Sequence, residues 1–312
     1  MSAHLFYQDN LDGLTVDLAA PVADGLVEEG LASAWFFLRY WERGNHLRLR
    51  VLPTSGAVAR VRVRIEEHAE KYFAAHPSEQ RMRPDEYELM AAEFARGERL
   101  DDYAKSLAPN NSLAFITYRP EHDRYGRGAS LQAVERHFAE SSQIALRVLR
   151  GRPTHEQRDT AAFALILSTW LCGEPGVDRL ARLACDVLDA VARRADAVLG
   201  PDELNERFHR QAPRLLTLGT RILRHPGAGP LAQWRASVRR LRDRLAELTL
   251  CGAFVPPQTG FTGASRRLYD VLPVLDICAH LVCNRLGLSI TEEIYLRYLA
   301  ARTVIELNEE GL

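Results

Sequence analysis

One short segment alternates basic with apolar residues, and its basic residues are His46, Arg48 and Arg50. On a β-strand, residues two apart point to the same face, so these side chains would lie next to one another. Neighbouring arginines repel each other unless an anion neutralises their charges. A guanidinium can hold such an anion, a carboxylate, through two parallel hydrogen bonds. The spacing therefore indicates a receptor for a carboxylate. A solvated arginine face, or arginines paired with the protein's own acids, is the alternative.

The same segment forms half of a predicted β-hairpin. Residues 34–41 and 46–52 are rich in aromatic and branched side chains, and the loop Glu42–Asn45 between them contains glycine and asparagine. This pattern is typical of two antiparallel strands. With that loop, three pairs would face each other across the hairpin: Trp41 with His46, Arg39 with Arg48, and Phe37 with Arg50. We therefore expect Arg39 to join the arginine face and the opposite face to be uniformly apolar.

A second charged stretch, residues 118–128, follows the predicted strand Leu113–Tyr118 and carries Glu121, Arg124 and Tyr125 before a glycine-rich turn. Charged side chains directly after a buried strand suit a catalytic loop on a rigid scaffold. An ordinary solvent-exposed loop is the alternative. The stretch lacks the glycine spacing of phosphate-binding and dinucleotide-binding loops.

A polar stripe runs along an otherwise apolar predicted helix, because Asp276, His280 and Asn284 recur every four residues. Buried polar side chains need hydrogen-bond partners, and Asp276 or Asn284 could fix the ring of His280. Histidine titrates near neutral pH, so the stripe suits a general acid or base. A histidine that is simply satisfied inside the core is the alternative.

The composition excludes several classes of protein. The 312 residues carry 40 basic and 41 acidic side chains, so no broad basic field attracts nucleic acid or a membrane. Five cysteines, an odd number, and a start without a signal-peptide pattern predict reduced thiols in the cytoplasm. Cys278, His280 and Cys283 do not have zinc-ligand spacing, so we expect no metal site. The longest apolar run, Ala161–Gly173, is shorter than the ~20 residues of a membrane span and predicts a core helix.

Strand-like segments come early in the chain and helical patterns come late, which favours an α+β fold over alternating βαβ units. We expect antiparallel strands and the hairpin within residues 1–128, and a helix-rich half, 129–312, packed on them as one domain, 1–312. Complete helices are expected at residues 18–30, 57–75, 131–150, 176–199 and 231–250. Two further helices are expected to begin at 155 and 201, one to end at 286, and the last to begin at 290.

Four stretches, taken in order, carry a resemblance over nearly the whole chain: Trp35–Tyr40, Gly44–Arg50, Tyr118–Gly126 and His280–Leu286. Together they resemble the C-terminal elimination domain of LanB-type lantibiotic dehydratases, which also occurs alone in thiopeptide-type bacteriocin biosynthesis proteins. The family usually has two consecutive glycines after its Arg-Tyr pair, whereas Arg127 separates Gly126 from Gly128 in this chain.

The resemblance implies an elimination reaction on a ribosomally made precursor peptide. A partner enzyme transfers glutamate from glutamyl-tRNA onto Ser or Thr, and the elimination domain removes it, leaving dehydroalanine or dehydrobutyrine. By their positions in the motifs, the catalytic residues would be Arg48, Arg50, Glu121, Arg124 and His280, and the substrate-binding residues Arg39, His46, Tyr125 and Asn284. The implied reaction uses neither a metal nor an organic cofactor.

With 312 residues and a nearly balanced charge, the chain is expected to act after a separate tRNA-dependent glutamylating enzyme, with no direct contact to nucleic acid or a membrane. Two alternatives stay open. Some relatives are pyridine synthases, which join two dehydroalanines in a formal (4+2) cycloaddition and expel the leader peptide. The other alternative is a non-catalytic peptide-binding partner of a glutamylating enzyme.

Overall fold

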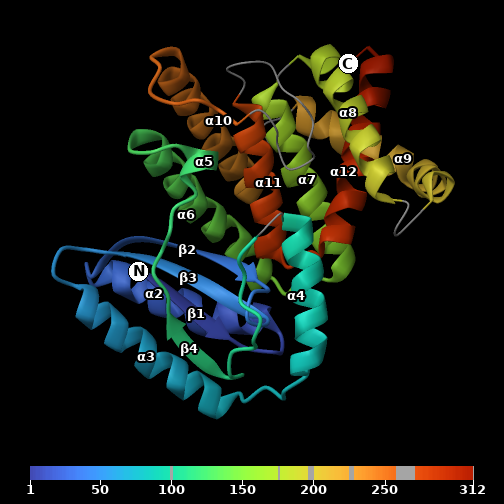
Figure 1. Cartoon of the computed structure of the whole chain (residues 1–312). Coiled ribbons are helices and arrows are strands. Elements are labelled where there is room, and N and C mark those ends of the chain that lie inside the picture. The colour runs from blue at the N-terminus through green and yellow to red at the C-terminus, as the bar shows by residue number, and fades with distance from the viewer. Residues whose placement is uncertain (99–100, 175, 196–199, 225–227, 258–270, 312) are drawn as a thin grey trace. The chain divides into compact units, whose positions relative to one another are not determined.

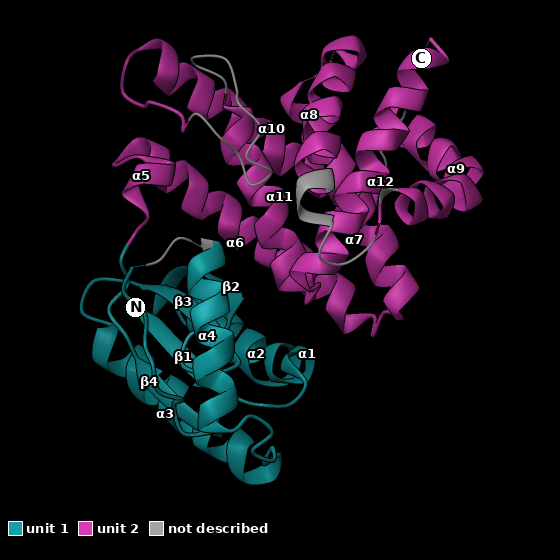
Figure 2. Ribbon diagram, turned by 45° about the vertical axis from the view of Figure 1, so that its right-hand side comes forward, with its two compact units in different colours: residues 1–119 teal, residues 120–312 magenta. Residues whose placement is uncertain are grey.

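The computed structural model describes residues 1–98, 101–174, 176–195, 200–224, 228–257 and 271–311 (Figure 1). The chain divides into two compact units, residues 1–119 and 120–312 (Figure 2). Unit 1 contains the strands together with several helices, and the described part of unit 2 contains helices alone. This order of elements confirms the predicted α+β class. The organisation of 1–312 as one domain stays a prediction.

Unit 1 is built on a four-stranded antiparallel sheet. Its strands are β1 (Ser2–Phe6), β2 (Ala32–Tyr40), β3 (His46–Pro53) and β4 (Ser112–Phe115), in the order β2-β3-β1-β4. The hairpin of β2 and β3 confirms the prediction from its aromatic and branched residues. β4 ends at Phe115, before the predicted Tyr118. Phe115 pairs with Ala3, and the last bond to β1 runs from the Ile116 N–H to the Ser2 carbonyl, at the first residue of β1.

One face of the sheet is largely apolar and is covered by helices. On this face Trp35, Phe37, Leu47 and Leu49 are each at most 3% exposed. The covering segments are α1 (Leu11–Gly13), the π-helical η1 (Leu14–Ala19), α2 (Ala20–Glu28) and α3 (Val58–Ala75). η1 contacts β3, α2 contacts β2, and α3 contacts β4. Burial of apolar surface, at about 25 cal/mol per Å², holds these layers together.

The helix α4 (Pro84–Glu98) was not among the predicted elements. Its proline and acidic start is typical of a helix, but the face that it buries carries only one large side chain, Tyr87, with Ala91 and Ala95. The Tyr87 hydroxyl accepts a hydrogen bond from the Arg43 backbone N–H at 2.7 Å and donates one to the Ala104 carbonyl at 2.6 Å. Tyr87 thereby ties α4 to the hairpin loop.

The second face of the sheet carries buried histidines. His4 on β1 stacks on His46 on β3, with ring centroids 4.9 Å apart, and both residues are at most 4% exposed. Burial, with His46, Arg48 and Arg50 nearby, lowers the pKa of His4 to about 2. Burial also lowers the pKa of His46 to about 3. Both imidazoles are therefore neutral at physiological pH.

Unit 2 is assembled around one buried helix. Its elements are α5 (His122–Tyr125), α6 (Ala129–Arg150), α7 (His155–Gly173), α8 (Val177–Ala195), α9 (Pro201–Arg224), α10 (Gly229–Leu250), α11 (Leu272–Leu286) and α12 (Ile290–Glu309). α7 contacts α8, α9, α10, α11 and α12, and its segment 165–172 is buried on all sides. A helix that is apolar all round is expected inside a protein, so the core helix predicted from 161–173 is confirmed.

The helix ends follow the signals in the sequence. Thr154 accepts a hydrogen bond from the Gln157 N–H, the Gln157 side chain accepts one from the Thr154 N–H, and Ser289 opens α12 by the same capping box. α11 ends at Gly287, whose φ of 80° is the left-handed conformation that glycine adopts at helix ends. The predicted helix 176–199 and loop 252–263 lie partly outside the described residues.

The cysteines are all free thiols. Cys278 and Cys283 are buried, and burial raises the pKa of Cys278 to about 12, so both act as packing residues. Among the described residues, no group of His, Cys, Asp and Glu is arranged to hold a metal ion. No helix in the described parts of the chain combines the length and the apolar character needed to cross a membrane.

The buried histidines make unit 1 sensitive to acid. Because the folded state lowers the pKa of His4 from 6.5 to about 2, its stabilising contribution is complete above pH 6.5 and is lost as the pH falls. Below about pH 5.5, where the unfolded-state imidazole is almost fully protonated, the free energy of unfolding should decrease by about 1.4 kcal/mol per pH unit for each such histidine. His4→Phe keeps a buried aromatic ring and removes the titration, so its stability should depend less steeply on pH.

Urea unfolding followed by circular dichroism at several pH values measures this slope. His209→Phe, at an exposed position on α9, is the matched control and should keep the slope of the unmodified chain. An identical slope for His4→Phe and the unmodified chain would contradict a buried neutral His4.

Candidate functional site

The hairpin differs from its predicted register by one residue. β2 ends at Tyr40 and β3 begins at His46, so the loop is Trp41–Asn45 rather than Glu42–Asn45. Arg43 and Gly44 have φ values of 67° and 105°, and the Gly44 N–H donates to the Trp41 carbonyl at 2.8 Å. A shift of one residue turns every side chain of a strand to the other face. The observed pairs are Tyr40 with His46, Leu38 with Arg48, and Phe36 with Arg50.

The predicted place of Arg39 on the arginine face is therefore wrong. Arg39 lies opposite Leu47 on the covered face and forms an ion pair with Asp12 on α1. The two side chains are 15% and 22% exposed. The covered face is thus not uniformly apolar, and the geometry of the hairpin gives no support to substrate binding by Arg39.

His46 positions Arg48. Its Nδ1 donates to the Gly44 carbonyl at 2.8 Å, and its Nε2 accepts from Arg48 Nε at 3.3 Å. Only a neutral imidazole can do both, in agreement with its lowered pKa. The Arg48 guanidinium lies over the Tyr40 ring, 3.3 Å from the centroid, and reaches Glu42 at 3.3 Å. His46 is 0% exposed, so it supports Arg48 from within the sheet, and its role in substrate binding stays a prediction.

Arg50 is also held by an aromatic ring. Its guanidinium carbon lies 4.2 Å from the centroid of the Tyr118 ring, and Tyr118 packs edge-on against Phe36. Stacking fixes the plane of a guanidinium, and that plane decides which carboxylate or oxyanion it can hold. Arg48 and Arg50 therefore form the anion-binding candidate of unit 1.

In unit 2, the short helix α5 presents a charged pair. Glu121 Oε2 and Arg124 NH1 are 2.9 Å apart, and both side chains are 55% exposed. Tyr125 is 3% exposed and packs edge-on against Phe138 on α6. Burial raises the pKa of Tyr125 well above its usual value. Glu121 and Arg124 thus face solvent, while Tyr125 anchors the turn in the core.

The turn after α5 depends on glycine. Gly126 has a φ of 72°, and a Cβ at this position would lie 2.8 Å from the Phe254 ring and closer still to Ser130 Oγ. Gly128 also has a positive φ, of 60°. Arg127, which departs from the family pattern, is accommodated between two glycines whose positive φ is strained for other residues.

His280 is held by a carboxylate that sequence reasoning missed. Its Nδ1 lies 2.7 Å from Glu293 Oε2 on α12. Glu293 is 2% exposed and the His280 side chain 21%. An ionised carboxylate only accepts hydrogen bonds, so we assign the proton of a neutral ring to Nδ1, which leaves the lone pair on Nε2. Carboxylates orient acid–base histidines in this way.

Asp276, the predicted partner of His280, binds Arg297 instead. Arg297 NH1 donates to Asp276 Oδ1, Arg297 Nε donates to Glu293 Oε1 at 2.8 Å, and Trp170 Nε1 donates to Asp276 at 3.0 Å. These four side chains are at most 3% exposed. Two carboxylates surround one guanidinium, so Glu293 is held on one side by Arg297 and on the other by His280.

The predicted residues fall into two groups. Arg48, Arg50 and His46 lie together in unit 1. Glu121, Arg124, Tyr125, His280 and Asn284 belong to unit 2, where Asn284 is half-buried one turn beyond His280 on α11. The convergence of both groups on one substrate stays a prediction.

Sequence reasoning missed Glu293 and His4. Glu293 and Arg297 are four residues apart on a helix whose other residues are mostly apolar, and this spacing could have indicated a charged pair facing the core. His4 alternates with Ser2 and Phe6, in the same period as the arginine face.

Among solved structures, the chain is similar to the "Pyridine synthase, TbtD, from thiomuracin biosynthesis", with 21% identity, a TM-score of 0.82, and coverage of 99% of this chain and 98% of that one. It is similar to TsrL, with 20% identity, a TM-score of 0.66, and coverage of 100% and 95%. It is also similar to the tRNA-dependent lantibiotic dehydratase MibB from Microbispora sp. 107891, with 19% identity, a TM-score of 0.60, and coverage of 99% of this chain and 28% of MibB. At these identities the likeness shows a shared fold.

The fold is thus one that a pyridine synthase and part of a lantibiotic dehydratase also have. The family model described as "Lantibiotic biosynthesis dehydratase C-term" matches residues 1–304, and the chain belongs to this family. Among curated proteins, none matches the chain significantly.

We expect Arg50→Lys to fold and to slow conversion of a peptide substrate by at least about tenfold, or ~1.4 kcal/mol. Lysine keeps the charge but lacks the planar group that stacks on Tyr118. Single-turnover conversion by mass spectrometry, measured beside the thermal midpoint, tests this. Arg64→Lys, in an exposed ion pair with Glu29, is the control. Wild-type conversion by Arg50→Lys would show that the arginine face is structural.

We expect Glu293→Gln to lower the rate by roughly 10²-fold, the lower end of what a positioned acid or base contributes. An amide can accept from Nδ1–H or donate to Nδ1, so the ring of His280 would no longer be held in one tautomer. The pH–rate profile and the thermal midpoint should be measured together, with exposed Glu309→Gln on α12 as control. A destabilised Glu293→Gln protein with an unchanged pH–rate profile would mean that Glu293 acts on stability alone.

Proposed function

We propose that this chain is a pyridine-forming cyclase that acts on a ribosomally made precursor peptide already carrying two dehydroalanines. The observation that supports this proposal is the likeness to TbtD over both whole chains, at a TM-score of 0.82, against 0.60 for MibB. The proposal reverses the preference for glutamate elimination that the sequence motifs give.

The reaction needs proton transfers and stabilisation of oxygen. For the (4+2) step, an amide proton next to one dehydroalanine moves from nitrogen to oxygen, and the ring then becomes aromatic as water and the leader peptide leave. His280, oriented by Glu293, is our candidate for the group that moves these protons at Nε2. Arg48 and Arg50 would donate to the oxygen on which negative charge develops, an effect of about 3–4 kcal/mol for a well-placed donor.

Glutamate elimination is the second candidate, favoured by specific residues. Arg48, Arg50, Glu121, Arg124 and His280 occupy the positions that the motifs of elimination domains assign to catalysis. In this reaction a base removes the Cα proton, and the glutamate leaves as a carboxylate, which is a better leaving group than hydroxide. The arginine pair would hold the departing carboxylate. A separate tRNA-dependent enzyme would supply the glutamylated peptide.

One experiment distinguishes the two reactions. The purified chain is incubated with two sets of leader–core peptides of the same sequences, one with two dehydroalanines and one with glutamyl esters at those positions. Mass spectrometry should show, for the first set, a core that has lost water together with a detached leader peptide. It should show no loss of glutamic acid from the second set.

His280→Ala should stop the conversion while the protein stays folded, whereas His209→Ala, at an exposed position on α9, should not change it. Loss of glutamic acid from the second set, without cyclisation of the first, would establish elimination and overturn cyclisation. Binding of the peptides without any conversion would leave only the role of a non-catalytic partner.

A further inference from the structure

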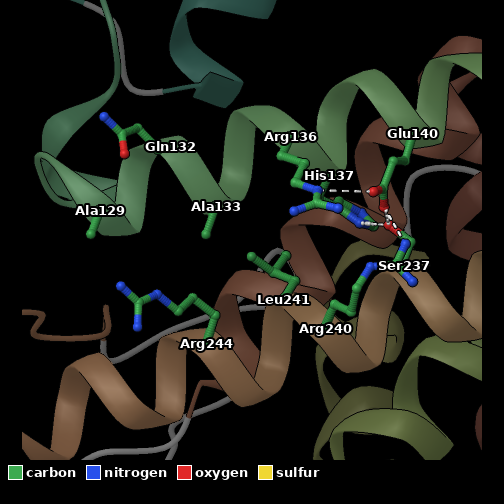
Figure 3. Close-up of a pocket in the computed structure, with 10 residues that line it drawn as sticks. All are labelled: Ala129, Gln132, Ala133, Arg136, His137, Glu140, Ser237, Arg240, Leu241 and Arg244. Atoms are coloured by element: carbon green, nitrogen blue, oxygen red, sulfur yellow. Dashed lines mark hydrogen bonds and ion pairs between the residues drawn. The ribbon is translucent and has the colours of Figure 1, made fainter.

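A pocket of about 400 Å³ lies between α6 and α10 in unit 2, and the residues that line it include none of those discussed for the reaction (Figure 3). Its volume is in the range of sites for small ligands, about 300–1,000 Å³. The residues that line it are Ala129, Gln132, Ala133, Arg136, His137, Glu140, Ser237, Arg240, Leu241 and Arg244.

One end of this pocket is a polar cluster. Figure 3 shows Glu140, Ser237 and Arg240 gathered there, with Gln132 and Arg244 toward the other end. Glu140 accepts from Arg240 NH2 at 2.8 Å, from Arg136 Nε at 3.2 Å, and from Ser237 Oγ. Burial raises the pKa of Glu140, but the hydrogen bonds from Ser237 and Arg240 outweigh burial and lower it overall. Glu140 is therefore ionised at neutral pH.

The cluster determines which nitrogen of His137 carries the proton. The single hydrogen of Ser237 goes to ionised Glu140, so Ser237 Oγ must accept from His137 Nδ1 at 2.8 Å. Burial lowers the pKa of His137 to about 3, so the ring is neutral and has no second proton. Its Nε2 is an acceptor that is buried and has no hydrogen-bond partner among the described residues. A buried acceptor of this kind requires a donor from water or a ligand.

The lining is positively charged. The described residues that line the pocket include three arginines, Arg136, Arg240 and Arg244, and one acid, Glu140. Because His137 is neutral, the lining carries a net charge of +2. Each guanidinium has five N–H donors, and Glu140 engages one nitrogen of Arg136 and one of Arg240. Arg244 pairs with the exposed Glu247 at 3.0 Å. Unused donors therefore border the pocket.

We propose that this pocket binds an amino-acid carboxylate: the side chain of an acidic peptide residue, or free glutamate. The guanidinium groups of Arg240 and Arg244 would hold the carboxylate, and an N–H group of the same ligand would donate to Nε2 of His137. Both sources share a carboxylate close to an N–H donor. The proposal does not depend on which reaction the chain catalyses.

The test uses the purified full chain and fluorescence anisotropy of a short fluorescein-labelled polyglutamate peptide. We expect saturable binding that weakens with added salt. Arg240→Gln/Arg244→Gln should raise Kd by at least about tenfold, or ~1.4 kcal/mol. Because these side chains are about half exposed, the variant should fold. Arg214→Gln/Arg221→Gln, at exposed positions on α9, changes the net charge equally and should leave Kd unchanged.

Competition with unlabelled L-glutamate identifies the source of the ligand. Displacement of the labelled peptide would assign the pocket to the free amino acid, whereas displacement only by unlabelled polyglutamate would assign it to peptide side chains. Equal weakening by the two double variants would show a non-specific charge effect and overturn the proposal. Binding of an uncharged polyglutamine peptide as tight as that of polyglutamate, or no binding of polyglutamate, would also overturn it.

Discussion

The guanidinium of Arg297, 1% exposed, lies between two buried carboxylates and links α11 to α12 beside the central helix α7. Asp276 comes from α11, Glu293 from α12 itself, and Trp170, which also donates to Asp276, from the central α7. Taking such charges out of water costs several kcal/mol per ion, and removing one partner of a buried pair destabilises by about 3–5 kcal/mol. The position of α11 against α12, and with it the orientation of His280, depends on this set remaining complete.

Local signals in the sequence account for most of the fold. Capping boxes predict that helices begin after Thr154 and Ser289, Gly287 marks the end of α11, and the apolar sequence of α7 predicts a core helix. Each of these signals depends on residues within a few positions of one another. The helix α4 was missed because its buried side is mostly alanine. The hairpin was predicted, but its register was not, since one extra loop residue changes nothing in the composition of the strands.

The candidate site was predictable by residue type more than by partner. Arg48, Arg50 and His280 are where strand and helix periodicity place them, on elements with fixed geometry. Their partners come from elsewhere in the chain: Tyr118 for Arg50, and Glu293 for His280. One sequence contains no signal for such contacts between distant segments. A shared fold can also support unlike reactions, so the conversion of the two sets of peptides, and not the architecture, decides between cyclisation and elimination.

The loop Trp41–Asn45 has a consequence for how this chain can vary in evolution. Surface loops usually accept insertions and deletions, because their length changes little else. In this hairpin, deletion of one loop residue would slide β2 against β3 and turn Trp35 and Phe37 away from the layer of helices that now buries them. Homologues that keep the arginine face should therefore conserve the length of this loop more strictly than its amino acids. Gly44 is the exception within it, because its φ of 105° is strained for any residue with a side chain, and a Cβ there would lie 2.9 Å from the end of the Leu107 side chain.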